Sequence, residues 1–252
     1  MRRIALARLG LLAGILGVWE LWAARGDPLL YVPPSRVLPA LLRVLRLEAY
    51  PTLLSHFGLT VLEVLVAYLL AVGLGLALGF ALGLSRQIGE IYEPLLAALY
   101  AIPSVVWYPS LMLFFGLGPA SKIAFGVLLG FFPVVLAVLA GIRSVDPHLL
   151  TVARGLGARP VTCFVKVILP AITATLLAGL RAGLALTVVG VLVGEILGAR
   201  GGLGYLINYA YGFLRTADYA ALALLALALV LVVDGVAAWV EARARRWTEG
   251  MA

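Results

Sequence analysis

The sequence has 252 residues, of which 63% are hydrophobic and 12% are charged, and its formal net charge is +7. Soluble domains carry about 25% charged residues, so this composition excludes an ordinary soluble protein and indicates an all-α protein that crosses the membrane several times. In such a protein the basic excess marks segments that face anionic lipid, which makes nucleic acid a poor candidate partner. The single cysteine, Cys163, excludes an internal disulfide, a zinc cluster and an iron–sulfur site.

The first predicted transmembrane helix is Ile4–Ala24, an apolar stretch that follows Met-Arg-Arg and that we expect to be retained rather than cleaved. The next segment, residues 25–57, is rich in proline. Within it, Arg36–Glu48 places its apolar residues at helical spacing between three arginines. This pattern predicts a periplasmic amphipathic helix that lies on the outer membrane surface.

Four of the later stretches are long and apolar enough to span a bilayer. The first of them carries a stripe of small residues at every fourth position, which allows another helix to approach closely. The stripe consists of Ala71, Gly75, Gly79 and Gly83. The four predicted spans are Gly58–Leu84, Lys122–Ile142, Ala171–Gly198 and Tyr219–Val240.

One further span, Glu93–Gly116, follows a polar turn at residues 85–92 and contains Pro103 and Pro109. Prolines inside a span free backbone carbonyls, which is tolerable only against protein or a water-filled cavity. Broken helices of this kind often border a substrate route, although a simple kink is the alternative. The candidate path residues in this segment are Pro103, Ser104, Trp107 and Tyr108.

A basic segment, residues 143–170, separates the fourth and fifth predicted spans. We expect two short helices, one at His148–Arg154 and one that begins at Pro160, around a bend with Gly155 and Gly157. Pro170 is expected to turn the chain into the next span. A basic, folded loop between membrane helices suits the docking of a cytoplasmic partner.

Four ionisable residues fall inside predicted spans, where each costs a few kcal/mol on insertion scales and therefore faces the bundle interior. Similar depth predicts a structural pair between Arg181 and Asp234. The alternative is that Arg181 attracts an anionic substrate in a pathway. Glu63 and Glu195 are expected toward the outer side, within reach of water, and Glu195 joins Arg181 as a candidate path residue.

Basic residues also predict the orientation. With the N-terminus inside, the larger share of the 19 Lys and Arg residues falls on the cytoplasmic side, together with both termini and the basic loop. The chain has no Gly-x-x-x-x-Gly-Lys-Ser/Thr phosphate-binding loop, so it is not itself a P-loop ATPase.

The basic loop carries a recognisable motif. Thr151-Val-Ala-Arg-Gly-Leu-Gly, followed after nine residues by Val167-Ile-Leu-Pro170, resembles the EAA signature of permease subunits of bacterial binding-protein-dependent ABC importers. It matches at Ala153, Gly157, Leu169 and Pro170, and it departs at Thr151, Val152 and Val167.

Further motifs resemble the nitrate/sulfonate/taurine branch of that family and cover about residues 30 to 246. They include Val32-Pro-Pro-Ser-Arg, Ile102-Pro-Ser, Phe115-Gly-Leu-Gly, Phe131-Phe-Pro, Gly141-Ile-Arg-Ser-Val-Asp-Pro, Gly179-Leu-Arg-Ala, Gly194-Glu-Ile-Leu-Gly and Gly202-Leu-Gly-Tyr-Leu-Ile.

The resemblance implies a single permease domain over residues 1–252, with about six transmembrane helices and a core at residues 58–242. It implies a multi-pass protein of the bacterial inner membrane that carries a small anionic or polar solute, such as nitrate, a sulfonate, taurine, bicarbonate or a vitamin precursor. It also implies that residues 143–170 couple the chain to an ATPase. The coupling residues would be Thr151, Ala153, Arg154, Leu156, Gly157, Ala158, Phe164, Leu169 and Pro170.

The implied partners are two copies of an ATP-binding subunit, an extracytoplasmic solute-binding protein, a second copy of the chain and membrane lipid. ATP and Mg would be held by the ATPase, so the chain itself would be neither an enzyme nor a cofactor-binding protein. A stand-alone secondary transporter or channel is the alternative, with Glu63 and Glu195 as its candidate coupling-ion site. A membrane scaffold without transport is a third class.

Overall fold

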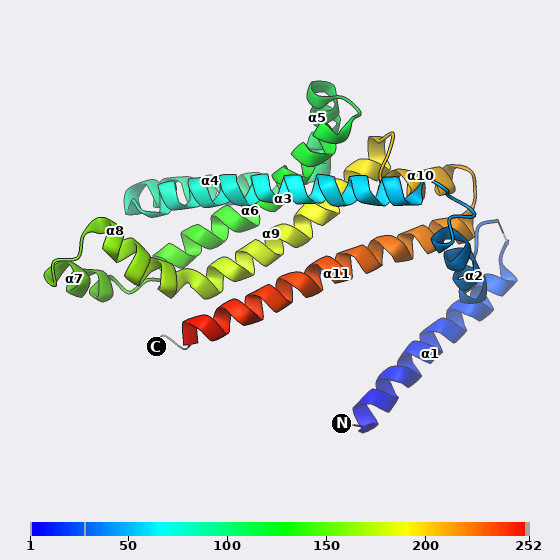
Figure 1. Ribbon diagram of the computed structural model, residues 1–252, viewed down its shortest axis with the longest axis horizontal. Coiled ribbons are helices and arrows are strands. Elements are labelled where there is room, and N and C mark those ends of the chain that lie inside the picture. The colour runs from blue at the N-terminus through cyan, green and yellow to red at the C-terminus, as the bar shows by residue number, and fades with distance from the viewer. Residues whose placement is uncertain (1, 28, 250–252) are drawn as a thin grey trace. The chain divides into compact units, whose positions relative to one another are not determined.

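The computed structural model describes residues 2–27 and 29–249, and every regular element in that part of the chain is helical. Helix is the expected state because a spanning segment must satisfy its backbone polar groups internally. The five longest helices are α1 (Arg2–Arg25), α3 (Leu53–Gly83), α6 (Pro119–Arg143), α9 (Leu169–Gly198) and α11 (Thr216–Glu249). Figure 1 shows them with the shorter elements that connect them.

The shorter elements lie between these helices. They are α2 (Pro34–Leu45), α4 (Arg86–Ala101), a 3₁₀ turn (Ser104–Trp107), α5 (Tyr108–Phe115), α7 (Pro147–Gly155), α8 (Pro160–Cys163), a π turn (Phe164–Ile168) and α10 (Leu203–Gly212).

Within the described residues, five helices are long and apolar enough to cross a membrane, and a bent helix pair makes up to six. The bent pair is Gln87–Ala101 with Ser104–Phe115, and its two arms meet at 82°. The break falls where expected, because the residue before Pro103 is held in an extended conformation that ends α4. Pro109 does not break a helix: it lies in the first turn of α5, where its missing N–H costs nothing.

Two local expectations were wrong. Residues 86–92 are not a polar turn but the first part of α4, which begins at Arg86. Pro170 does not turn the chain, because one helical run extends over Pro160–Gly198. The π turn at Phe164–Ile168 precedes the proline, and this looser winding accommodates a residue that lacks an N–H donor.

The described chain packs into two compact units. One comprises Met1–Thr60 and Glu195–Leu229, and the other comprises Val61–Gly194 and Val230–Ala252. In the first unit, α2 buries Val37, Ala40 and Val44, as its amphipathic sequence predicts. The helix ends at Leu45, shortly before Leu47 turns the chain with a φ of 62°.

In the second unit, α3, α6 and α9 run alongside one another (Figure 1). The predicted stripe of small residues on α3 faces α6: a Cβ atom added at Gly75 would lie 2.7 Å from Val134 Cγ1, and one added at Gly79 would lie 2.7 Å from Val138 Cβ. Glycine is therefore what allows the two helices to approach so closely.

Candidate functional site

The bent segment between α4 and α5 holds four of the predicted path residues. Pro103 and Trp107 are exposed, Ser104 is half-buried, and Trp107 retains 45% of its accessible surface. Figure 1 shows α5 at a steep angle to α4. The segment therefore presents a proline, a hydroxyl and an indole on the surface of the second unit.

Tyr108 differs from its neighbours in the bent segment, because it is 1% exposed. Its hydroxyl donates a hydrogen bond of 2.6 Å to the carbonyl of Gly194 on α9, and its ring lies 4.9 Å from the ring of Phe125 on α6. Tyr108 thus anchors the start of α5 in the interior and leaves Ser104 and Trp107 as the accessible groups.

The predicted pair between Arg181 on α9 and Asp234 on α11 is confirmed. The guanidinium donates two hydrogen bonds, both 2.8 Å long, to the two carboxylate oxygens of Asp234. A third nitrogen lies 3.4 Å from Glu241. This bidentate geometry is the strong form of an arginine–carboxylate contact, and two acidic groups around one guanidinium offset its attraction for an anion.

Glu63 and Glu195 are not within reach of water, contrary to expectation, because they are 2% and 1% exposed. Glu195 has a clear role in this buried position. Its carboxylate accepts 2.7 Å hydrogen bonds from the Thr60 hydroxyl and from the Gly204 N–H. The Gly204 N–H lies in the first turn of α10, where backbone donors have no partner within the helix. The carboxylate therefore caps this helix, and its negative charge suits the positive end of the helix dipole.

Two further side chains complete the cap of α10. The Leu203 N–H donates to Thr60 Oγ1 over 2.8 Å, and the Gly202 N–H donates to His56 Nδ1 over 3.0 Å. His56 also stacks on Tyr205, with ring centroids 5.6 Å apart. Sequence reasoning missed Thr60 and His56. These two polar side chains lie one helical turn apart at the start of a predicted span, and this spacing could have indicated that they contact the same group.

The loop between α6 and α9 folds as two short helices around a glycine bend, as predicted. Asp146 caps α7 by accepting a 2.8 Å hydrogen bond from the His148 N–H. Gly157 adopts a φ of 79°, which non-glycine residues rarely take. Leu156 beside it is 84% exposed.

The predicted coupling residues lie on both sides of this loop. Phe164 packs edge-on against Phe80 of α3, with ring centroids 5.1 Å apart, and so anchors the loop on a cluster around Val145, Ile168 and Ile172. Thr151, Arg154, Leu156, Gly157 and Pro170 are exposed, whereas Ala153, Ala158 and Leu169 are half-buried. The loop is thus held on one side and open on the other.

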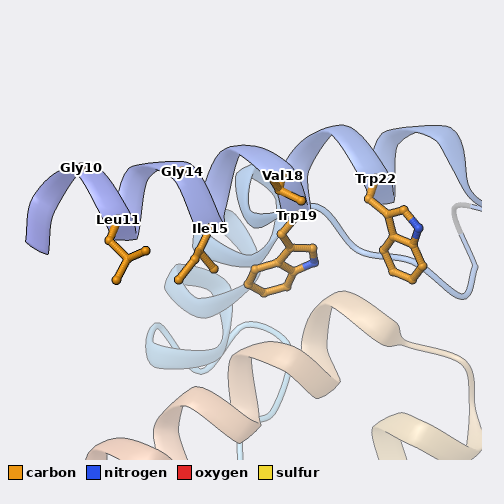
Figure 2. A pocket seen from close by; sticks show the side chains of 7 residues that line it. All are labelled: Gly10, Leu11, Gly14, Ile15, Val18, Trp19 and Trp22. Atoms are coloured by element: carbon orange, nitrogen blue, oxygen red, sulfur yellow. The ribbon is translucent and has the colours of Figure 1, made fainter. Parts of the chain in front are cut away.

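The described residues include neither a metal site nor a charged groove in α1. Among residues 2–27 and 29–249, no group of three or more His, Cys, Asp or Glu side chains could hold a metal ion. Figure 2 shows an apolar groove along α1, which is not a site for a polar solute because none of its lining side chains carries a charge. Its lining residues are Gly10, Leu11, Gly14, Ile15, Val18, Trp19 and Trp22.

Comparisons with known proteins agree with the sequence motifs. Residues 71–246 match the family of binding-protein-dependent transport system inner membrane components. A probable ABC transporter permease protein of Haemophilus influenzae is 34% identical over 82% of this chain and 84% of its own length. The taurine transport system permease protein of Escherichia coli is 32% identical over 91% of this chain and 86% of its own length.

A solved structure shares the fold. A chain of the MetNI methionine ABC transporter, in an inward-facing conformation, superposes with a TM-score of 0.64 over 77% of this chain and 98% of its own length. At 21% sequence identity, this likeness concerns the fold alone. From the family match and the curated relatives, the chain belongs to the binding-protein-dependent transport system inner membrane components, in the branch with the taurine and sulfonate permeases, and is a multi-pass inner-membrane permease subunit of an ATP-driven importer.

Proposed function

We propose that the chain forms the translocation path for a small polar or anionic organic solute and is driven through its α7–α8 loop by a separate ATPase. The observation that carries this proposal is the loop itself, which is anchored by Phe164 and exposes Leu156 beside Gly157, whose φ is 79°. A rigid loop of this kind can transmit a push from a partner to the spans on either side. A stand-alone transporter or channel would have no use for it.

The solute class rests on the named relatives. Besides the taurine permease, they include an aliphatic sulfonate permease of Bacillus subtilis, 31% identical over 81% of this chain, and a riboflavin permease of Chloroflexus aurantiacus, 37% identical over 64%. These solutes are organic and polar. Aliphatic sulfonates are anionic and taurine is zwitterionic. Nitrate, bicarbonate and other vitamin precursors remain candidates by resemblance. We expect selectivity to reside in the extracytoplasmic binding protein, so a ligand screen on that protein identifies the solute.

Within the chain, we propose that Pro103, Ser104 and Trp107 border the path. Tyr108 and Glu195 are assigned positioning roles instead, since both side chains are buried and hydrogen-bonded to backbone groups. Arg181 is assigned a structural role, since Asp234 holds its guanidinium in a bidentate pair. A second copy of the chain would complete the path, because a single bundle of about six helices is small for enclosing one.

The proposed assembly contains two permease chains, two ATPase subunits and one solute-binding protein in the bacterial inner membrane. ATP and Mg are assigned to the ATPase subunits, and no cofactor is assigned to this chain. Both termini and the α7–α8 loop are placed in the cytoplasm. This placement is supported by the basic residues of the loop, Arg154, Arg159 and Lys166.

The docking step is tested by co-purification of the permease with its ATPase from detergent-solubilised membranes. Gly157→Asp should abolish the complex, because the φ of 79° is strained for any other residue and the loop must change shape. Leu156→Asp should weaken the complex without changing the loop. Gly155→Ala is the matched control, since this glycine has an ordinary backbone conformation and open space around it.

Two outcomes contradict the proposal. If Gly157→Asp still binds the ATPase and stimulates its activity normally, the loop is not the docking element. If the chain alone, reconstituted without an ATPase, moves taurine or a sulfonate down an ion gradient, the alternative of a stand-alone secondary transporter is correct.

A further inference from the structure

Two oppositely charged side chains are fully buried at one end of the second unit. Glu63 on α3 is 2% exposed and Lys122 on α6 is 1% exposed. Burial of a single charge is costly unless an opposite charge compensates it. Neither residue belongs to the predicted path or to the coupling loop, so their presence in the interior requires another explanation.

The packing of α3 against α6 relates the two residues. The helices run parallel and meet at small residues once per turn, and each residue on α6 lies 59 positions after the residue that it meets on α3. The contacts are Ala67 with Gly126, Ala71 with Gly130, Gly75 with Val134, Gly79 with Val138 and Gly83 with Ile142. A constant offset over five successive contacts means that the helices keep one register along this seam.

The same register extends by one turn toward the start of both helices. One turn before Ala67 is Glu63, and one turn before Gly126 is Lys122, which again lies 59 positions later. We infer that Glu63 and Lys122 face each other across the end of the α3–α6 seam and form a buried charge pair that positions α5.

The link to α5 comes from the ammonium group of Lys122. Its Nζ donates hydrogen bonds to the carbonyls of Leu117 and Gly118, over 2.6 Å and 3.2 Å, and contacts Ser121 Oγ at 3.2 Å. These oxygens belong to the turn that follows α5 and to the first turn of α6. These oxygens carry no net charge, so the charge of the ammonium group is compensated by Glu63.

The other end of α5 is fixed by the bond from Tyr108 to Gly194 on α9. The α5 helix is therefore held at both ends, by a tyrosine at its start and by the lysine at the turn after it. Glu63 and Lys122 are positioning residues in this scheme and do not touch the solute. The consequence for transport rests on the proposed role of the bent segment, whereas the pairing itself does not.

The pairing is tested by a double-mutant cycle on the full chain in the complex with its ATPase and, separately, on the full chain alone in lipid nanodiscs. The variants are Glu63→Gln, Lys122→Met and the double variant. Each single change leaves one buried charge uncompensated, so we expect the melting temperature to fall by about 5 °C or more. The double variant removes both charges and should lie within about 2 °C of the wild type.

A spin label reports the position of α5 directly. Phe114 is 82% exposed, so a label on Phe114→Cys in a Cys163→Ala background reads the mobility of α5. Glu63→Gln should mobilise the label, because the uncompensated ammonium group no longer holds the turn after α5. Lys122→Met should mobilise it both alone and in the double variant, because both lose the hydrogen bonds from Nζ to the Leu117 and Gly118 carbonyls. The label therefore reports how α5 is held, and the melting cycle reports the pairing of the two charges.

An exposed pair provides the control. Arg46 and Glu48 lie 4.0 Å apart with side chains that are 71% and 55% exposed, so the cycle with Arg46→Met and Glu48→Gln should show no coupling.

Three results would overturn the inference: single variants that melt like the wild type, a double variant whose shift is the sum of the single shifts, or a Lys122→Met variant whose label is no more mobile than that of the wild type. If single variants cannot be purified, recovery of the double variant supports the pairing and its failure overturns it. If the wild-type chain forms no complex with the ATPase, but the melting temperatures in nanodiscs still show that Glu63 and Lys122 are coupled, the docking proposal is refuted and the pairing stands.

Discussion

At the scale of single residues, buried polar side chains in this protein bind backbone groups rather than solute. Three backbone N–H groups at the start of α10 donate hydrogen bonds to the side chains of Glu195, Thr60 and His56. The Thr60 hydroxyl in turn donates to Glu195. The chain enters this helix through Gly202, whose φ is 100°. Because backbone donors in the first turn have no partner within the helix, these three side chains help to fix its position.

Replacement of Glu195 tests this cap. Glu195→Ala leaves the Gly204 N–H without its acceptor and the Thr60 hydroxyl with the longer bond to the His56 carbonyl, so we expect a loss of about 1–3 kcal/mol in the free energy of unfolding. Glu195→Gln retains one acceptor oxygen and should lose less. Thermal melting of the purified permease complex measures both.

A second variant probes the same cap from the backbone side. Gly202→Ala is strained by its φ and would place a Cβ atom against the Glu195 carboxylate, so it should destabilise the protein as Glu195→Ala does.

If Glu195→Ala melts like the wild type while solute transport is lost, the carboxylate belongs to the path rather than to the cap.

At the scale of helices, the contacts of α3 with α6 depend on the absence of side chains at regular positions. Lipid gives helices little hydrophobic reason to associate, so close backbone approach supplies the packing energy. Gly79 lies against Val138 in this seam, whereas Gly73 on the same helix has open space around it.

These two glycines form a matched pair for mutation. Gly79→Leu should push α3 away from α6 and destabilise the protein by about 1–3 kcal/mol, the usual range for overpacking. Gly73→Leu should have little effect, because its side chain would enter open space. Thermal melting distinguishes them, and equal effects would mean that helix propensity rather than the seam determines the outcome.

The sequence predicts those features of the helices that depend on local pattern. The stripe of small residues on α3, the break at Pro103 and the amphipathic α2 follow from spacing and from proline chemistry, and all three are present. The bend angle of 82° does not follow, because it depends on the anchoring of Tyr108 to α9. The buried position of Glu195 was likewise not predictable, since its partner Thr60 lies 135 residues away in the chain.

At the scale of the whole molecule, the distribution of basic residues predicts which side of the membrane each loop occupies. Basic residues are retained on the cytoplasmic side, so the α7–α8 loop and both termini are expected there. Successive spans then alternate in direction. The turn after α5 and the segment after α2 are expected outside, and the turn between α3 and α4 is expected inside with the α7–α8 loop.

Cysteine labelling tests this orientation with little background, because Cys163 is the only cysteine and can be replaced by alanine. Glu48→Cys and Leu117→Cys should react with a membrane-impermeant maleimide in intact cells. Leu84→Cys and Leu156→Cys should react only after the membrane is opened, in cells that produce the permease without the ATPase so that the docking loop is uncovered. All four native side chains are exposed, at 55%, 45%, 56% and 84% respectively, so access to the reagent is limited by the membrane and not by burial within the chain. Because Leu156 also lies at the centre of the proposed docking loop, its labelling in intact cells would place that loop outside and exclude a cytoplasmic ATPase as its partner.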